Sequence, residues 1–180
     1  MDAIFEHQYA LPADLSPRLA IVMRQIEFAR NYTMTLLEDL NDDDWFWSPP
    51  EYPTHIAWQV GHIAMSEYGL TMFQQRGRLT EDRELMSGKY RKLFLRGTEP
   101  KLDREAYPSP PEILEVLNNV HQQMRIEVPT FEEILDEEVG PPHAAYATKY
   151  GALLFAPQHE MLHAGQIGML RRLMGKPSIR

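Results

Sequence analysis

Apolar residues at helical spacing are the feature that most constrains how this 180-residue chain can fold. Over residues 17–40 and 54–76 they recur every three or four positions, which is the period of an amphipathic helix. Strand-forming residues are not concentrated in alternating runs, whereas Leu, Met, Ala, Glu, Gln and Arg fill the periodic stretches. The sequence therefore predicts an all-α fold. Its length suits one domain over residues 1–180, and its 43% apolar residues can fill a core.

Capping and breaking residues give the expected helix bounds. Ser16, Thr54 and Ser109 are expected N-caps, the last within a capping box, and Gly77 and Gly175 are expected stops. Helices are expected over residues 17–40, 54–76, 81–92, 109–129, 130–138 and 148–174.

Four of these predicted helices are long, and connections of very unequal length join them. This arrangement predicts a four-helix bundle with up-down or crossover topology. The connection over residues 78–108 has few periodic signals, and a connection of that length is usually functional or mobile. Pro157 lies inside the last helix and forfeits a backbone hydrogen bond there, so we expect a kink or a fresh helix start.

Charge and cysteine content exclude several classes of protein. The formal charge is −8, and the basic clusters at 89–92 and 171–172 are too small for a nucleic-acid footprint, so no nucleic-acid partner is expected. The chain has no cysteine, which excludes disulfides, thiolate catalysis by the protein and Cys-ligated metal sites. No signal peptide and no apolar run of ~20 residues is visible. We therefore expect no membrane partner and a soluble, cytoplasmic protein.

Two histidines interrupt the apolar face of the last predicted helix. Seven residues at steps of three or four share that face: Ala152, Phe155, His159, His163, Gln166, Leu170 and Leu173. The face is apolar at both ends and polar in the middle, although in a bundle it would form the core seam. Because residues at i and i+4 lie about 5–6 Å apart at Cβ, His159 and His163 can reach one metal ion. Gln166 would either support a ligand histidine or form an interhelical hydrogen bond.

The second predicted helix carries a matching histidine. Six residues lie along its apolar face: His55, Trp58, Gln59, His62, Met65 and Gly69. His62 lies in mid-helix, and a third ligand from a facing helix would complete a site with open positions for water or substrate. Gly61 and Gly165 would let neighbouring backbones approach closely. His55 lies near the helix start, where a cap or a solvent contact is the simpler interpretation.

These motifs together resemble one known family. Trp58-Gln-Val-Gly-His62, with the run from His159 to Arg172, is similar to the DinB-like superfamily. Residues 93–109 resemble its long connection between the second and third helices. The resemblance implies a four-helix bundle of the DinB/YfiT-like type, and commonly a homodimer. It also implies a divalent metal ion, such as zinc, nickel or iron, held by His62, His159 and His163.

The resemblance also implies a range of activities. Characterised relatives include S-transferases and isomerases that use low-molecular-weight thiols, and YfiT-like proteins are associated with hydrolysis. The chain is therefore expected to be a metal-dependent hydrolase or thiol-dependent S-transferase acting on a small-molecule substrate. Water or a thiol next to the ion would have a lowered pKa and become a nucleophile. A non-catalytic metal-binding module and a metal-free dimeric interaction module remain open alternatives.

His159-Glu160-Met-Leu-His163 also matches the H-E-x-x-H pattern of zinc metalloproteases. In those enzymes the glutamate acts as a base beside the metal. Helix geometry rotates Glu160 by about 100° from His159, toward solvent or a neighbouring helix. The protease interpretation is therefore disfavoured.

The sequence leaves the roles of several other polar residues undetermined. Ser66, Glu67 and Tyr68, one turn beyond the candidate ligand of the second helix, are candidates to touch a substrate. We expect His121 to be structural, and the acidic stretch over 132–138 to be a solvated helix face.

Overall fold

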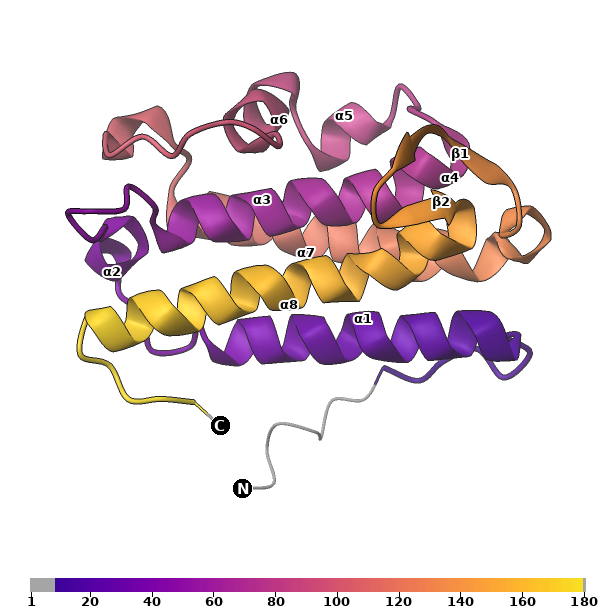
Figure 1. Ribbon diagram of the computed structural model, residues 1–180, viewed down its shortest axis with the longest axis horizontal. Helices are drawn as coiled ribbons and strands as arrows, with labels where there is room; N and C mark the ends of the chain where they lie inside the picture. The colour runs from indigo at the N-terminus through magenta and orange to yellow at the C-terminus, as the bar shows by residue number, and fades with distance from the viewer. Residues whose placement is uncertain (1–8, 180) are drawn as a thin grey trace.

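The computed structural model describes residues 9–179, and the side chains of all of these but 141 and 142 (Figure 1). Its helices are α1 (Pro17–Thr35), α2 (Asp42–Phe46), α3 (Ile56–Tyr68), α4 (Gln74–Arg76), α5 (Asp82–Leu85), α6 (Gly88–Phe94), α7 (Pro110–Glu127) and α8 (Lys149–Leu173). A π-helical turn covers Gly69–Phe73, and 3-10 turns cover Arg104–Ala106, Val128–Thr130 and Glu132–Ile134. The strands are β1 (Glu138–His143) and β2 (Tyr146–Thr148). The predicted all-α class is confirmed, with this one small hairpin added.

The four longest helices, α1, α3, α7 and α8, lie alongside one another (Figure 1). α1 packs against α8, and α3 packs against both α7 and α8. The connection between α3 and α7 runs along the outer side of α3 and carries α5 and α6. It brings the ring of Phe94, at the end of α6, onto Gly61 of α3, where an added Cβ would lie 2.3 Å from a ring carbon. Gly61 thus allows a close approach as predicted, but by a side chain rather than a backbone.

Two predicted N-caps are confirmed. The hydroxyl of Ser16 accepts the N–H of Leu19 at 3.3 Å, and Ser109 forms the predicted capping box with Glu112. Gly77 directly follows α4 and is the stop that the sequence predicted. Its φ is 79°, a conformation that glycine adopts without a Cβ clash.

Three other predicted bounds are wrong. His55, rather than Thr54, caps α3, because its Nδ1 accepts a backbone N–H of the first turn at 3.1 Å. The first helix ends at Thr35, since the next residues form tighter i→i−3 hydrogen bonds. The predicted helix over 81–92 is two short helices, because Ser87 lies between them and caps the second.

The predicted helix over residues 130–138 is also wrong. A single 3-10 turn, Glu132–Ile134, is followed by β1. The side chain of Leu135 is fully buried, and its carbonyl accepts the N–H of Tyr150 at 2.8 Å. Contacts with the start of α8 therefore replace the i→i−4 hydrogen bonds that a helix would need, and tertiary packing overrides the local capping pattern.

The hairpin leads directly into α8 at one end of the bundle (Figure 1). β1 and β2 are antiparallel, with Glu138 opposite Thr148 and His143 opposite Tyr146, and the register is irregular between these pairs. The hydroxyl of Thr148 then accepts the N–H of Gly151 at 3.1 Å and caps α8. The path of the hairpin therefore ties His143 to the first turn of the helix that carries two of the candidate ligands.

α8 is the longest helix, with 25 residues. It runs unbroken through Pro157, so the predicted fresh helix start at this residue is wrong. Pro157 and its neighbour Ala156 are both buried, and this packing offsets the hydrogen bond that the proline cannot make. Neither α8 nor any other helix among the described residues is long and apolar enough to cross a membrane.

Candidate metal centre

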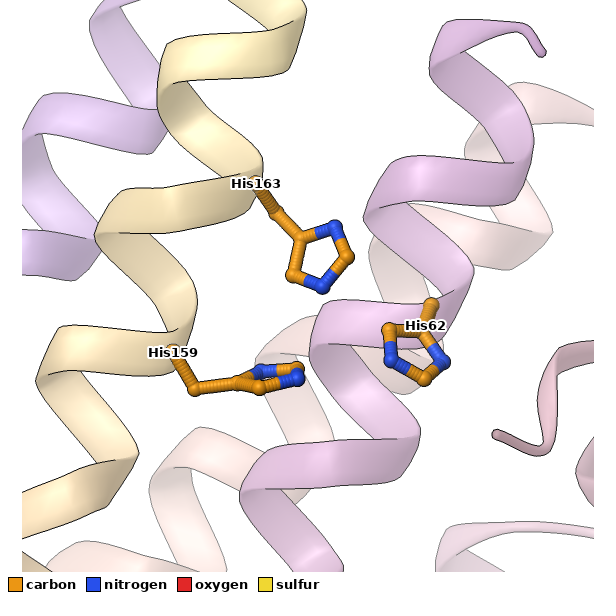
Figure 2. A group of neighbouring side chains, drawn as sticks. All are labelled: His62, His159 and His163. Atoms are coloured by element: carbon orange, nitrogen blue, oxygen red, sulfur yellow. The ribbon is translucent and has the colours of Figure 1, made fainter. Parts of the chain in front are cut away.

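The structure brings the three predicted histidines together between α3 and α8 (Figure 2). His62 comes from α3, and His159 and His163 lie one turn apart on α8. The ring centroid of His62 lies 5.2 Å from that of His159 and 4.8 Å from that of His163. The centroids of the two α8 rings are 4.6 Å apart. One nitrogen from each ring lies within 4.8 Å of the other two. The histidines that the helical spacing singled out therefore share one site.

Two neighbours fix the ring of His62. Its Nδ1 lies 2.6 Å from the carbonyl oxygen of Phe94, to which it donates. The indole of Trp58 stacks on the ring at 4.9 Å between centroids, with the planes 6° apart. Because Nδ1 carries the proton, Nε2 keeps its lone pair for a metal ion. The hydroxyl of Ser66 lies 3.3 Å from that Nε2, so this candidate substrate contact does border the site.

A side chain of α3 also holds His163. Its Nδ1 lies 2.5 Å from Oε1 of Gln59, and Nε2 of the same amide donates to the hydroxyl of Thr54 at 2.8 Å. With Oε1 of the amide toward the imidazole, Nδ1 of His163 is the donor and its Nε2 faces the site (Figure 2). Gln59 has a role that no single helix reveals. Its place three residues before His62, on the same face, is the signal that could have identified it.

Burial keeps the three imidazoles neutral. Burial, followed by the positive charges of protonated His159 and His62, lowers the pKa of His163 to about 3. Burial, followed by His62, Arg96 and His143, lowers the pKa of His159 to about 4. Burial also lowers the pKa of His62. Since a metal ion binds the neutral imidazole, the ligand lone pairs are available at neutral pH.

The donor set fits a divalent metal ion. Imidazole suits zinc, nickel and iron. Bonds of about 2.0–2.1 Å in a tetrahedral zinc site place the ligand nitrogens roughly 3.3 Å apart, so small side-chain rotations close the present separations. Within residues 9–179 no Asp, Glu or Cys joins the group. A bound ion would therefore keep coordination positions for water or a substrate.

A model of the family described as the DinB superfamily matches residues 25–167. The match spans most of the chain and includes all three histidines. The chain belongs to the DinB superfamily. A search of curated proteins gave no match.

In this DinB-superfamily chain, Glu160 faces away from the histidines. Its Oε1 accepts from Nε of Arg30 on α1 at 3.0 Å, and Nη2 of Arg30 also donates to Glu67 at 2.6 Å. Of the two predicted directions for Glu160, the neighbouring helix is therefore the observed one. Both carboxylates are buried and bound to Arg30, so neither is placed to act as the base of a metalloprotease or to touch a substrate.

These residues belong to a larger, mostly buried group, which we call the arginine network. Its members are Glu27, Arg30, Glu67, His121, Arg125 and Glu160. The Nδ1 of His121 lies 2.7 Å from Glu67, and Nε2 lies 3.3 Å from Glu27. His121 therefore has the structural role that the sequence favoured. The acidic residues of α1 and α3 that complete the network were not predicted.

Other predicted roles are corrected by the positions of the side chains. Gln166 is exposed, so it neither supports a ligand nor bonds between helices. An added Cβ on Gly165 would meet nothing within 4 Å, so no backbone approaches there. The hydroxyl of Tyr68 donates to Asp82 at 2.8 Å instead of facing the histidines. His55 is 1% exposed, which supports the capping role and excludes a solvent contact.

Proposed function

We propose that this DinB-superfamily protein is a divalent-metal-dependent enzyme, either a hydrolase or a thiol-dependent S-transferase. One observation carries the proposal: three neutral imidazoles converge in a helical seam and no acidic side chain among the described residues completes a fourth ligand. Structural zinc sites are closed by four protein ligands, whereas catalytic sites keep a position open. The open position favours an enzyme over a non-catalytic metal-binding module.

The chain's own residues would hold the ion and shape the space beside it. His62, His159 and His163 supply the nitrogens, and a bound divalent ion lowers the pKa of water or a thiol so that it becomes a nucleophile at neutral pH. The hydroxyl of Ser66, which lies beside Nε2 of His62, is placed to hydrogen-bond such a nucleophile. The rings of Trp58 and Phe155 would limit the access of water on two sides. Since the chain has no cysteine, a reacting thiol would come from a small molecule.

Elemental analysis of untagged protein tests the first step. We expect about one equivalent of zinc, nickel or iron in the wild type, and loss of that metal in His62→Ala and His163→Ala. Gln166→Ala is the matched control, because this exposed residue lies on α8 close to His163 and should leave metal content unchanged. Absence of stoichiometric metal from the wild type, or its persistence in both histidine variants, would refute the proposal.

Cobalt substitution tests whether the ion is open to substrates. A thiol that binds the ion should add a sulfur-to-cobalt charge-transfer band, and catalysis should appear as S-transfer to an electrophile such as 1-chloro-2,4-dinitrobenzene. A hydrolase should instead cleave an activated ester such as p-nitrophenyl acetate. Either activity should vanish with a chelator and in His163→Ala. Stoichiometric metal with no thiol binding and no activity would favour the non-catalytic module.

The remaining expectations stay predictions. A homodimer would be detected by light scattering of the purified protein. The small-molecule substrate, the identity of the metal, the thiol and the cytoplasmic location each follow from the family resemblance or from composition.

A further inference from the structure

Two polar side chains from distant segments meet at the edge of the candidate metal centre. Arg96 follows α6, and His143 is the last residue of β1. Nη1 of Arg96 lies 3.1 Å from Nε2 of His143. We call these two residues the rim pair. Neither belongs to the three-histidine group.

Arg96 is held against α3 by contacts on both sides of it in the chain. Two residues earlier, the carbonyl oxygen of Phe94 accepts from His62 at 2.6 Å. Two residues later, the hydroxyl of Thr98 accepts from Nε1 of Trp58 at 3.3 Å, and that indole stacks on His62. The segment carrying Arg96 is therefore attached to one metal ligand both directly and through the indole.

His143 approaches the site from the side of α8. Its ring stacks on Tyr146 at 4.5 Å and lies 5.7 Å from the ring of Phe155. The ring of Phe155 in turn lies 5.7 Å from that of His159. One aromatic ring thus separates the rim pair from a candidate metal ligand.

The exposed Arg96 and the half-buried His143 present hydrogen-bond donors that a ligand from outside can use. The backbone N–H of Ala145 donates to Nδ1 of His143 at 3.1 Å. A neutral imidazole has only one acceptor nitrogen, so His143 cannot accept from Ala145 and from Arg96 at the same time. In the tautomer that accepts from Ala145, Nε2–H of His143 and an N–H of Arg96 converge with no protein acceptor between them. An oxygen bearing negative charge is the group that two converging donors would bind.

The charge around the rim pair favours the same ligand. Arg96 forms no ion pair within residues 9–179, although the chain carries 26 acidic residues. Arg96 carries a permanent positive charge, and a neutral His143 adds the dipole of its N–H. The field at this edge of the site is therefore positive, and it adds to the charge of a bound metal ion.

We infer that Arg96 and His143 form an oxyanion subsite, which binds a carboxylate of the small molecule that occupies the metal centre. This inference rests on the proposed function and specifies its substrate class: a molecule with a reacting group at the metal and a carboxylate a few bonds away. The carboxylate belongs either to the thiol or to the second substrate.

Two matched thiols test the subsite. 3-Mercaptopropionate and 3-mercaptopropan-1-ol differ only in whether a carboxylate or a hydroxyl stands at the far end. Calorimetric titration of zinc-loaded protein should show that Arg96→Gln weakens binding of the carboxylate thiol about fivefold and leaves the alcohol unchanged. Arg96→Lys should retain part of the affinity, because it keeps the charge. Lys92→Gln, an exposed residue of α6, removes the same charge and should change neither thiol.

Succinate, which has no thiol, identifies the source of the carboxylate. If Arg96→Gln also weakens succinate binding, the subsite accepts a substrate without sulfur; an effect on the mercapto acid alone assigns the carboxylate to the thiol. Equal weakening of both thiols by Arg96→Gln, or no weakening of either, overturns the inference. If the protein binds no metal, the proposed function fails separately. Calorimetric titration of metal-free protein with succinate then decides the subsite: binding lost in Arg96→Gln supports it, and no such difference overturns it.

Discussion

The candidate metal centre and the arginine network are two polar regions inside one bundle, and they differ in whether their side chains find partners of opposite charge within the protein. The network sets three carboxylates against two guanidinium groups and His121. The metal centre gathers three histidines with no acidic side chain among the described residues. The two regions share elements: Glu160 follows His159 on α8, and Glu67 lies one turn after His62 on α3.

The pKa shifts show what this difference means. Burial and the nearby Arg30 disfavour the charged form of His121, but the negative charge of Glu67 and the hydrogen bonds that His121 donates to Glu27 and Glu67 outweigh both, so its pKa is raised. Burial would raise the pKa of Glu67, yet Arg30 and His121 lower it to about 2. In the metal centre nothing opposes burial strongly, and the pKa of His163 falls to about 3. The network pairs its charges within the protein, whereas the histidines keep lone pairs that an ion from outside can use.

The largest expected effect comes from breaking the network. Arg30→Met leaves Glu67 and Glu160 buried without their shared cation, and we expect a loss of about 3–5 kcal/mol in the free energy of unfolding. Urea unfolding measures the change. Arg24→Met is the matched control, because it removes an exposed arginine of the same helix and should shift stability by less than about 0.5 kcal/mol. Equal stabilities of the two variants would contradict a self-contained network.

Filling the metal centre should produce the next largest effect. At a free zinc concentration 100 times the Kd, binding should stabilise the native state by about 2.7 kcal/mol. A chelator should reverse this gain, and His163→Ala should show none of it. Thermal unfolding with and without zinc provides the measurement, with Gln166→Ala as the control that keeps the gain. A similar zinc effect in His163→Ala would place the bound ion elsewhere.

Substitutions at two glycines should have smaller effects, and they test whether the anchor of His62 affects metal binding without affecting the arginine network. A Cβ at Gly61 would lie 2.3 Å from the buried ring of Phe94, whose carbonyl holds His62, so Gly61→Ala should displace that anchor. We expect a loss of about tenfold in zinc affinity, or about 1.4 kcal/mol, with the network intact. Gly165→Ala is the control, because a Cβ there meets nothing and should stabilise the helix by roughly 0.5–1 kcal/mol. Unchanged zinc affinity in Gly61→Ala would show that zinc binding does not depend on the hydrogen bond between His62 and the Phe94 carbonyl.

The pH dependence of stability should show the smallest effect. Because the pKa of folded His121 is raised above 6.5, its contribution is fully present below pH 6.5 and is lost as pH rises through the folded value. In chelator, the stability difference between wild type and His121→Gln should therefore shrink as pH increases from 6. Urea unfolding across that pH series measures it. A difference that grows with pH would mean that the network does not favour the charged imidazole.

Much of the fold followed from local patterns. Helical spacing and the caps at Ser16 and Ser109 gave the long helices, because these signals depend only on neighbours in the chain. The errors lie where distant contacts overrule local preference. Residues 130–138 leave the helix to bury Leu135 against α8, and Gln166 is exposed although its spacing places it near the histidine seam.

The sequence by itself determined the helical class, the family and the three histidines, since a histidine on an apolar helix face stands out without any neighbour. Only the tertiary structure decided which partner each of those side chains has. It paired Gln59 with His163 and the Phe94 carbonyl with His62, joined Arg96 to His143, and turned Glu160 toward Arg30. Hydrogen bonds and ion pairs between residues far apart in the chain depend on how the helices pack, and no local spacing encodes that packing.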